Sequence, residues 1–279
     1  MRYEFHDSSA LELAELIQGA LVSVQQDSAH VLQFYSQETK SAVDARTTSL
    51  SKLESVLHAC LLGMIFVGQH LTDPEWWDRS MGTAPDDEHL EGYVSRYTEF
   101  TKIGLIQATF SSIESSIRLV LRSLSPDTYK RLRVDFRHIC YYLIDEFMRD
   151  ERQHYRAVTD IMRLIRNTVH NNGVFSPKSG RDVRIWYRDQ IYAFEAEKVV
   201  NFADWQLLLQ IIVDFSEFIS RVMTQPVITE LEHIEDPMIS QLVSNGLTED
   251  STPDDSAGQT TEDSTPDDSA GGPSNTPTS

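Results

Sequence analysis

The sequence predicts a mainly α-helical bundle with a small β-hairpin inserted before the last helix and a disordered acidic C-terminal tail. Through most of the chain, apolar residues recur at alternating steps of three and four, the spacing of one buried helix face. Residues 181–202 differ, because β-branched and aromatic side chains flank a short polar turn, as in a hairpin. The end of the chain has no aromatic residue and many acids, which is typical of disorder.

The N-terminal region, residues 1–95, is predicted to hold two helices, over 9–37 and 47–71. A loop is expected over 72–90, which is rich in Pro, Gly and Asp. The most apolar stretch, 56–71, contains polar interruptions and is shorter than a bilayer crossing. We therefore expect a buried helix there and no membrane partner.

The second region, residues 96–226, is predicted to be a helical domain. Apolar spacing places helices over 98–124, 136–147 and 155–169, and Asn171-Asn172-Gly173 is a typical helix stop. The hairpin of 181–202 follows, and 203–223 forms the closing helix.

The tail, residues 245–279, is predicted to be disordered. The segment "TEDSTPDDSAG" occurs at 248–258 and again at 261–271, with no large apolar side chain in either copy. Such a segment cannot bury enough surface to offset the entropy of ordering. It is expected to keep the protein soluble, with coverage of a basic segment as a second option.

The cysteines and the start of the chain indicate a cytoplasmic location. Cys60 and Cys140 are far apart and form no CxxC pair, so we expect two small core residues rather than a disulfide. The first residues lack a basic stretch followed by an apolar one, so no signal peptide is expected.

Charge is unevenly distributed along the chain. The formal net charge is −19, yet residues 118–188 hold 15 Lys and Arg against 8 Asp and Glu. A basic segment within an acidic protein can bind an anion locally.

Most of this basic character falls on one predicted helix. One position away from its apolar core residues, polar side chains repeat at the same alternating spacing, so they share a stripe beside the buried face. The stripe comprises Arg149, Arg152, Arg156, Thr159, Arg163, Arg166 and His170.

This stripe has the residue types that RNA cleavage by its own 2′-hydroxyl requires. Arginine presents a flat set of donors that matches a phosphate, and histidine exchanges protons near neutral pH. Such cleavage needs a base, an acid and a cation near phosphorus, and no metal. Simpler interpretations are a solvated face with an Arg156–Asp160 ion pair, and a histidine bonded to the last helix carbonyls.

The segments "RLIRNTVHNNG" and "FSSIESSIRLVLRSLSP" together resemble the HEPN superfamily of small helical domains, over roughly residues 98–225. The resemblance implies a homodimer and metal-independent endoribonuclease activity, with a toxin or defence role. His170 would transfer protons, Asn167 would orient it or the phosphate, and an arginine would bind phosphate. Arg166 precedes Asn167 with three residues before His170, whereas Arg163 has six, so both remain candidates.

Further residues have secondary roles in this hypothesis. Arg149, Arg152 and Arg156 are expected to bind RNA phosphates, and Glu114 and Asn171 are candidate supporting residues. For Glu114 a simple ion pair with Arg118 is the favoured interpretation. No cofactor or metal is expected, because P-loop, GxGxxG and CxxC patterns are absent from the sequence.

Two alternatives remain open. A non-catalytic module could use the arginines to hold a nucleotide, RNA or an acidic partner, or the stripe could simply complete a homodimer interface. Two Glu-x-x-His pairs, Glu151/His154 and Glu230/His233, raise the weaker option of a di-metal site.

Overall fold

The computed structural model describes residues 10–41, 43–132 and 135–244 of the chain. The predicted disordered tail, 245–279, lies outside these residues. The α-helices are α1 Ala10–Leu32, α2 Gln37–Ser41, α3 Ala45–Phe66, α4 Pro74–Met81, α5 Asp87–Leu124, α6 Pro126–Leu132, α7 Phe136–Phe147, α8 Arg152–His170, α9 Trp205–Met223, α10 Pro226–Thr229 and α11 Pro237–Ser244. The strands are β1 Val174–Phe175, β2 Val183–Tyr187, β3 Gln190–Phe194 and β4 Lys198–Val199.

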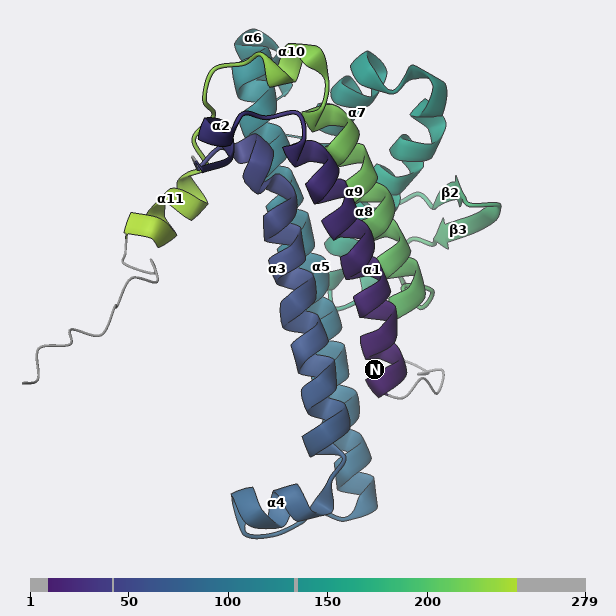
Figure 1. The fold of residues 1–279 in the computed structure, drawn as a ribbon. Helices are drawn as coiled ribbons and strands as arrows, with labels where there is room; N and C mark the ends of the chain where they lie inside the picture. The colour runs from purple at the N-terminus through teal and green to yellow at the C-terminus, as the bar shows by residue number, and fades with distance from the viewer. Residues whose placement is uncertain (1–9, 42, 133–134, 245–279) are drawn as a thin grey trace, which may run out of the picture.

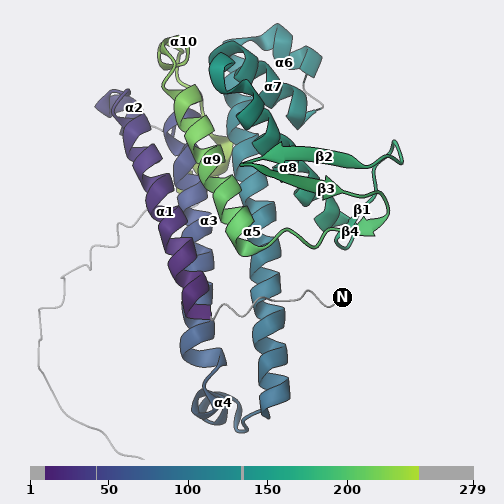
Figure 2. The same ribbon diagram turned by 90° about the vertical axis from the view of Figure 1, so that its right-hand side faces the viewer.

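The fold is mainly α-helical with one small hairpin before α9, as the sequence predicts. Helices α1, α3, α5 and α9 lie side by side, and α7 and α8 pack against α5 and α9 (Figures 1 and 2). Helices α3 and α5 extend beyond the other helices as a two-helix stalk, with α4 at its end. The helical body therefore gathers at one end of the molecule, and α8 lies within it.

Aspartates define where several helices begin. The side chains of Asp44, Asp86 and Asp204 accept backbone N–H groups in the first turns of α3, α5 and α9. The predicted loop over 72–90 was wrong in part, because α4 forms there. Asp73 caps it, Pro74 occupies its first position and Gly82 ends it at φ 77°, so the turn-forming residues mark the ends of a short helix.

The N-terminal helices share a core with the rest of the chain. Helix α1 packs against α3 and α9, and α3 packs against α5. Ile17, Leu57, Ile117 and Phe215 are all fully buried in one continuous cluster. The predicted boundary at residues 95 and 96 falls inside α5, because a 38-residue helix runs through both regions.

Two buried ion pairs fasten the segment after α9 to the start of α3. Asp44 receives two hydrogen bonds from the guanidinium of Arg46 and one from its backbone N–H, and the guanidinium also donates to the carbonyl oxygens of Ile228 and Leu231. Lys52 Nζ lies 2.7 Å from Asp236, and all four charged side chains are at most 3% exposed. Because each charge has a partner, the segment stays fixed against α3.

Helix α3 continues into a π-helical turn, Val67–Leu71. Together the two form one apolar helix of 27 residues, Ala45–Leu71. Its length and composition would allow it to cross a membrane, with a mean hydropathy of 1.6 in its most apolar window. From the sequence we expect a buried helix over 56–71, which covers only part of this stretch. In the structure, 44% of that window is buried against other helices.

Helix α8 ends as predicted. Asn172 and Gly173 adopt φ values of 53° and 82°, and Gly173 donates its N–H to the carbonyl of Thr168. Strand β1 then pairs with β4, while β2 pairs with β3 from Val183↔Phe194 to Tyr187↔Gln190. The predicted hairpin over 181–202 is thus confirmed for β2 and β3.

Candidate functional site

Helix α8 carries most of the predicted site residues, but its start shortens the predicted stripe. Met148 leaves the helical conformation with φ −127°, and Arg149 lies in a short 3₁₀ turn, Arg149–Glu151. The continuous stripe therefore begins at Arg152 and not at Arg149. Met148 itself is buried at this turn.

At the N-terminal end of α8, two arginines share one carboxylate on α7. Arg156 Nη2 lies 2.7 and 2.6 Å from the two oxygens of Asp145, and Arg152 Nε lies 3.1 Å from it. The predicted Arg156–Asp160 pair was wrong, because Asp145 on the neighbouring helix is closer to Arg156. A shallow hollow of about 400 Å³ opens here, lined by Arg149, Asp150, Arg152, Gln153 and Arg156.

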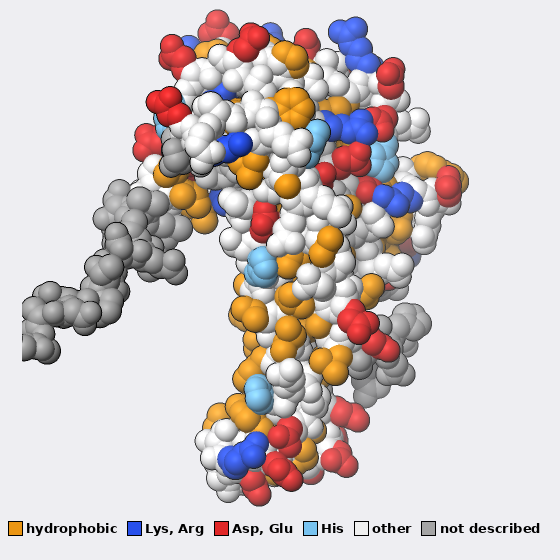
Figure 3. All heavy atoms as spheres, viewed as in Figure 1, with side chains coloured by type: hydrophobic (Ala, Val, Ile, Leu, Met, Phe, Trp, Pro, Cys, Tyr) orange, Lys and Arg blue, Asp and Glu red, His pale blue; other side chains and the backbone are white. Residues whose placement is uncertain are grey.

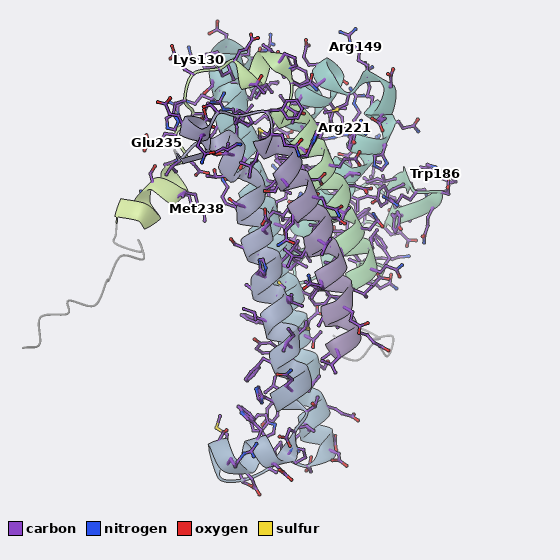
Figure 4. The ribbon with its side chains drawn as sticks, viewed as in Figure 1. Lys130, Arg149, Trp186, Arg221, Glu235 and Met238 are labelled. Carbon is purple, nitrogen blue, oxygen red and sulfur yellow. The ribbon has the colours of Figure 1, made fainter. Side chains whose placement is uncertain are left out.

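The hollow gathers the three predicted phosphate-binding arginines, but its charge is largely balanced. Arg149 points outward at the surface (Figure 4). Two acids, Asp145 and Asp150, offset most of the three positive charges. The hollow is therefore only weakly positive.

In the middle of α8, Asp160 collects donors from two helices. Arg137 Nε lies 2.8 Å from one oxygen, Tyr141 donates to the other at 2.7 Å, and Arg163 Nη2 lies 3.6 Å away. The Tyr141 ring also makes cation–π contacts, with the guanidinium carbons of Arg137 and Arg156 at 4.8 and 4.5 Å from its centroid. Burial and the hydrogen bond to Asp160 raise the pKa of Tyr141. Arg163 is thus part of an ion-pair network.

At the C-terminal end of α8 the arginine is differently placed. The guanidinium of Arg166 lies 4.8 Å from the ring centroid of Phe110 and 3.4 Å from Asn167 Oδ1. Within the described ranges it has no carboxylate partner, although the side chain is partly buried. Its Nε is buried without a hydrogen-bond acceptor, as are those of Arg156 and Arg163, so the missing carboxylate is what sets Arg166 apart. Arg166 is therefore a cation that no carboxylate among the described residues neutralises.

His170 lies one turn beyond Arg166 and is exposed. It makes no hydrogen bond or ion pair to any residue placed in the structure, so the simpler interpretation of a histidine bonded to helix carbonyls does not hold. Arg166, Asn167 and His170 thus lie in the last turn or so of α8, whereas Arg163 lies about one turn earlier, beside Asp160. Arg156 is fourteen residues from His170, about 21 Å along the helix, so the hollow cannot contact the same phosphate.

The two predicted supporting residues have structural surroundings. Glu114 accepts hydrogen bonds from Arg118 Nε at 2.9 Å and Nη2 at 2.6 Å, which confirms the simpler interpretation. Asn171 is the residue after α8, and its N–H donates to the carbonyl of Thr168.

A second polar cluster, here called the Asp214 cluster, was not found from the sequence. Asp214 on α9 is 2% exposed and accepts hydrogen bonds from Tyr187 at 2.7 Å, Arg188 at 2.5 Å and Gln210 at 3.2 Å. His154 Nε2 on α8 lies 3.2 Å from the same carboxylate. Burial opposes its charge, but the surrounding donors outweigh burial and lower the pKa of Asp214.

The Asp214 cluster had a signal in the sequence. Asp214 interrupts an otherwise apolar helix face, with Ile211, Phe215 and Phe218 buried around it. An acid at such a position requires donors from other elements. Arg137 and Tyr141 on α7 were also missed, because their partner Asp160 lies on another helix.

The cysteines and the metal options can be placed as well. Cys60 and Cys140 are buried free thiols, as predicted, and burial raises the pKa of Cys60 to about 11. Glu151 pairs with Arg221, while His154 and His233 face Asp214 and Asp44. Across residues 10–41, 43–132 and 135–244, no three His, Cys, Asp or Glu side chains form a group that could hold a metal ion.

Comparison with known proteins does not add to this description. No family model, no curated protein and no solved structure matches the chain.

Proposed function

We propose that the protein binds RNA at the C-terminal end of α8 and cleaves it without a metal ion, as a HEPN-like domain. The observation that carries the proposal is Arg166, a partly buried guanidinium with no carboxylate partner in the described part of the chain, one turn from the exposed His170. A partly buried cation without an anion is costly in free energy. A phosphate that binds there would supply the missing charge and acceptors.

The surroundings favour Arg166 over Arg163 as the phosphate ligand. Arg163 contributes to the charge balance of Asp160, whereas Arg166 contacts a neutral amide and an aromatic ring. Asn167 Oδ1 is the polar group beside the Arg166 guanidinium, at 3.4 Å, so Asn167 is proposed as a positioning residue. Its proposed role is to orient the N–H groups of the Arg166 guanidinium that bind the phosphate.

His170 is proposed as the proton carrier. A base takes the proton of the 2′-hydroxyl, the 2′-oxygen attacks phosphorus, and an acid returns a proton to the departing 5′-oxygen. The products are a 2′,3′-cyclic phosphate and a 5′-hydroxyl. This helix end offers one histidine, so we propose that a second copy of the chain supplies the other proton carrier in a homodimer.

The second candidate function is phosphate binding without cleavage. The hollow of Arg149, Arg152 and Arg156 is the observation behind it, because three arginines meet there with no histidine among the lining residues and a phosphate would compete with Asp145 for Arg152 and Arg156. In this case the protein would hold RNA or a nucleotide electrostatically, and affinity would fall steeply with salt.

The test is cleavage of single-stranded RNA in the presence of a chelator. We expect 2′,3′-cyclic phosphate ends with wild-type protein and a loss of about 100-fold or more in rate with His170→Ala. His58→Ala is the matched control, because His58 is an exposed histidine on α3 whose Nδ1 hydrogen-bonds to the carbonyl of Glu54 in the same helix. Intact RNA across a range of pH with folded wild-type dimer would exclude cleavage. Salt-sensitive binding in that case would support the second candidate.

A further inference from the structure

The outer face of the β2–β3 hairpin presents an aromatic and a basic side chain together. Residues Arg184, Trp186 and Ile191 are exposed on this face, and Trp186 stands directly opposite Ile191 in the strand register. Trp186 is 54% and Ile191 56% exposed. In the views of Figures 2 and 4 the hairpin projects from the helical body, with Trp186 away from it.

The opposite face of the hairpin holds it in place. Ile185, Tyr187 and Phe194 are buried against the helices, as the alternation of a half-buried sheet requires. Tyr187 stacks with His154 of α8 at 5.8 Å and donates to Asp214 of α9. The outer face is therefore a fixed surface and not a free loop.

The turn of the hairpin is also fastened. Arg188 and Asp189 both have positive φ, 45° and 60°, which matches the twist of a two-residue hairpin turn. Residues other than glycine adopt this conformation at a cost. Arg188 is held there by two hydrogen bonds to the buried Asp214, so the turn keeps its shape and Trp186 its position.

One basic side chain, that of Arg184, lies beside Trp186 on this face. Arg184 lies two residues away on the same face and has no ion-pair partner in the part of the chain described. Residues 178–189 hold four cations and two acids, and one of the cations, Arg188, is paired with the buried Asp214. Of the two acids, Asp182 accepts a hydrogen bond from the backbone of Ala196. Arg184 and the Trp186 ring together complement a ligand that has both an anionic group and an aromatic ring.

We propose that this hairpin face binds unpaired RNA, with a base stacked on Trp186 beside Ile191 and the adjoining phosphate on Arg184. The inference rests on the proposed function and narrows its substrate class to single-stranded RNA. Stacking on an exposed aromatic ring is available to every unpaired base, whereas a base within a duplex is already stacked. Trp186 makes no aromatic contact with the other described residues, so its ring is free for a base.

The test measures binding separately from cleavage. Fluorescence anisotropy with a 2′-O-methyl single strand, which cannot form the 2′-oxygen nucleophile, reports affinity alone. We expect Trp186→Ala to weaken binding roughly 5- to 150-fold and Trp186→Phe to retain most of it. Arg184→Ala should lower affinity and reduce the salt dependence. Phe100→Ala is the matched control, because Phe100 is 72% exposed on the stalk.

Each outcome decides between the two proposals. Unchanged affinity in folded Trp186→Ala, or equal affinity of wild type for a duplex, would overturn the hairpin proposal while leaving cleavage at His170 intact. Strong single-strand binding that depends on Trp186, without cleavage of unmodified RNA, would support the hairpin and overturn nuclease activity. Loss of self-association in Trp186→Ala with no change in RNA affinity would identify a protein contact and reject the RNA site.

Discussion

The Asp214 cluster and the C-terminal end of α8 gather charged side chains in opposite ways. Asp214 is buried, and donors from α8, α9 and the hairpin surround it. Arg166 is partly buried, and no carboxylate of the described chain neutralises it. In the first arrangement the chain itself supplies the partners of the buried charge, which stabilises the fold. The second lacks an anion, and for this reason we place the function there.

The largest predicted effect separates these two regions by stability. Asp214→Ala would leave Tyr187 and Arg188 without their acceptor in a buried setting. We expect the free energy of unfolding in urea to fall by about 3–5 kcal/mol, as for other broken buried networks. Asp145→Ala is the matched control; its carboxylate is 42% exposed, so the loss should be below about 1 kcal/mol. Equal losses in both variants would contradict the structural role of Asp214.

The second prediction concerns acid stability. Burial opposes the charges of Asp44, Asp214 and Asp236, but their hydrogen bonds outweigh burial and lower the pKa of each carboxyl. Their stabilisation is present above the unfolded pKa near 4 and is lost as pH falls through the folded values. Asp27 acts in the opposite direction, because burial raises its pKa.

Thermal unfolding from pH 7 to pH 2 measures this balance. We expect the midpoint temperature of unfolding to decrease once the pH drops below about 4. The corresponding loss in the free energy of unfolding should be on the order of a few kcal/mol. Asp236→Asn should make the fall shallower, since it removes one of the three groups. A midpoint that stays constant or rises on acidification would show that these carboxyls are not stabilised in the folded state.

The smallest predicted effect concerns Glu114 and tests whether this residue belongs to the candidate site. Glu114 pairs with Arg118 on one helix, and both side chains are about a quarter exposed. Glu114→Gln should therefore change the free energy of unfolding by less than about 0.5 kcal/mol and leave RNA cleavage unchanged. A large loss of cleavage in this variant would return Glu114 to the site.

The sequence was sufficient for most of the helices but for few of the ion pairs. Apolar spacing located α5, α7, α8 and α9, because burial of one face governs where each helix lies. Caps are local as well, so Asn172 and Gly173 ended α8 where expected. Helix α4 was missed since its Asp, Pro and Gly were interpreted as loop residues.

The candidate site was predictable in its residues and not in their partners. The helical spacing correctly placed Arg163, Arg166 and His170 on one side of α8. It could not distinguish Arg163 from Arg166, because Asp160 is neutralised jointly by α7 and α8. Such contacts between helices depend on packing that local patterns do not encode. Which face of the predicted hairpin is exposed also depends on how it packs against the helices, so the exposure of Trp186 was not predicted.

Arg166→Met tests the central claim most directly, because it removes the charge while keeping much of the side-chain volume above Phe110. Unfolding in urea and binding of a single-stranded 2′-O-methyl RNA are measured on the same sample. Our account predicts unchanged or greater stability, since an uncompensated cation is lost, together with at least a roughly tenfold loss of RNA affinity. A folded protein that is clearly less stable and binds RNA as wild type does would show that Arg166 serves the fold and not a ligand.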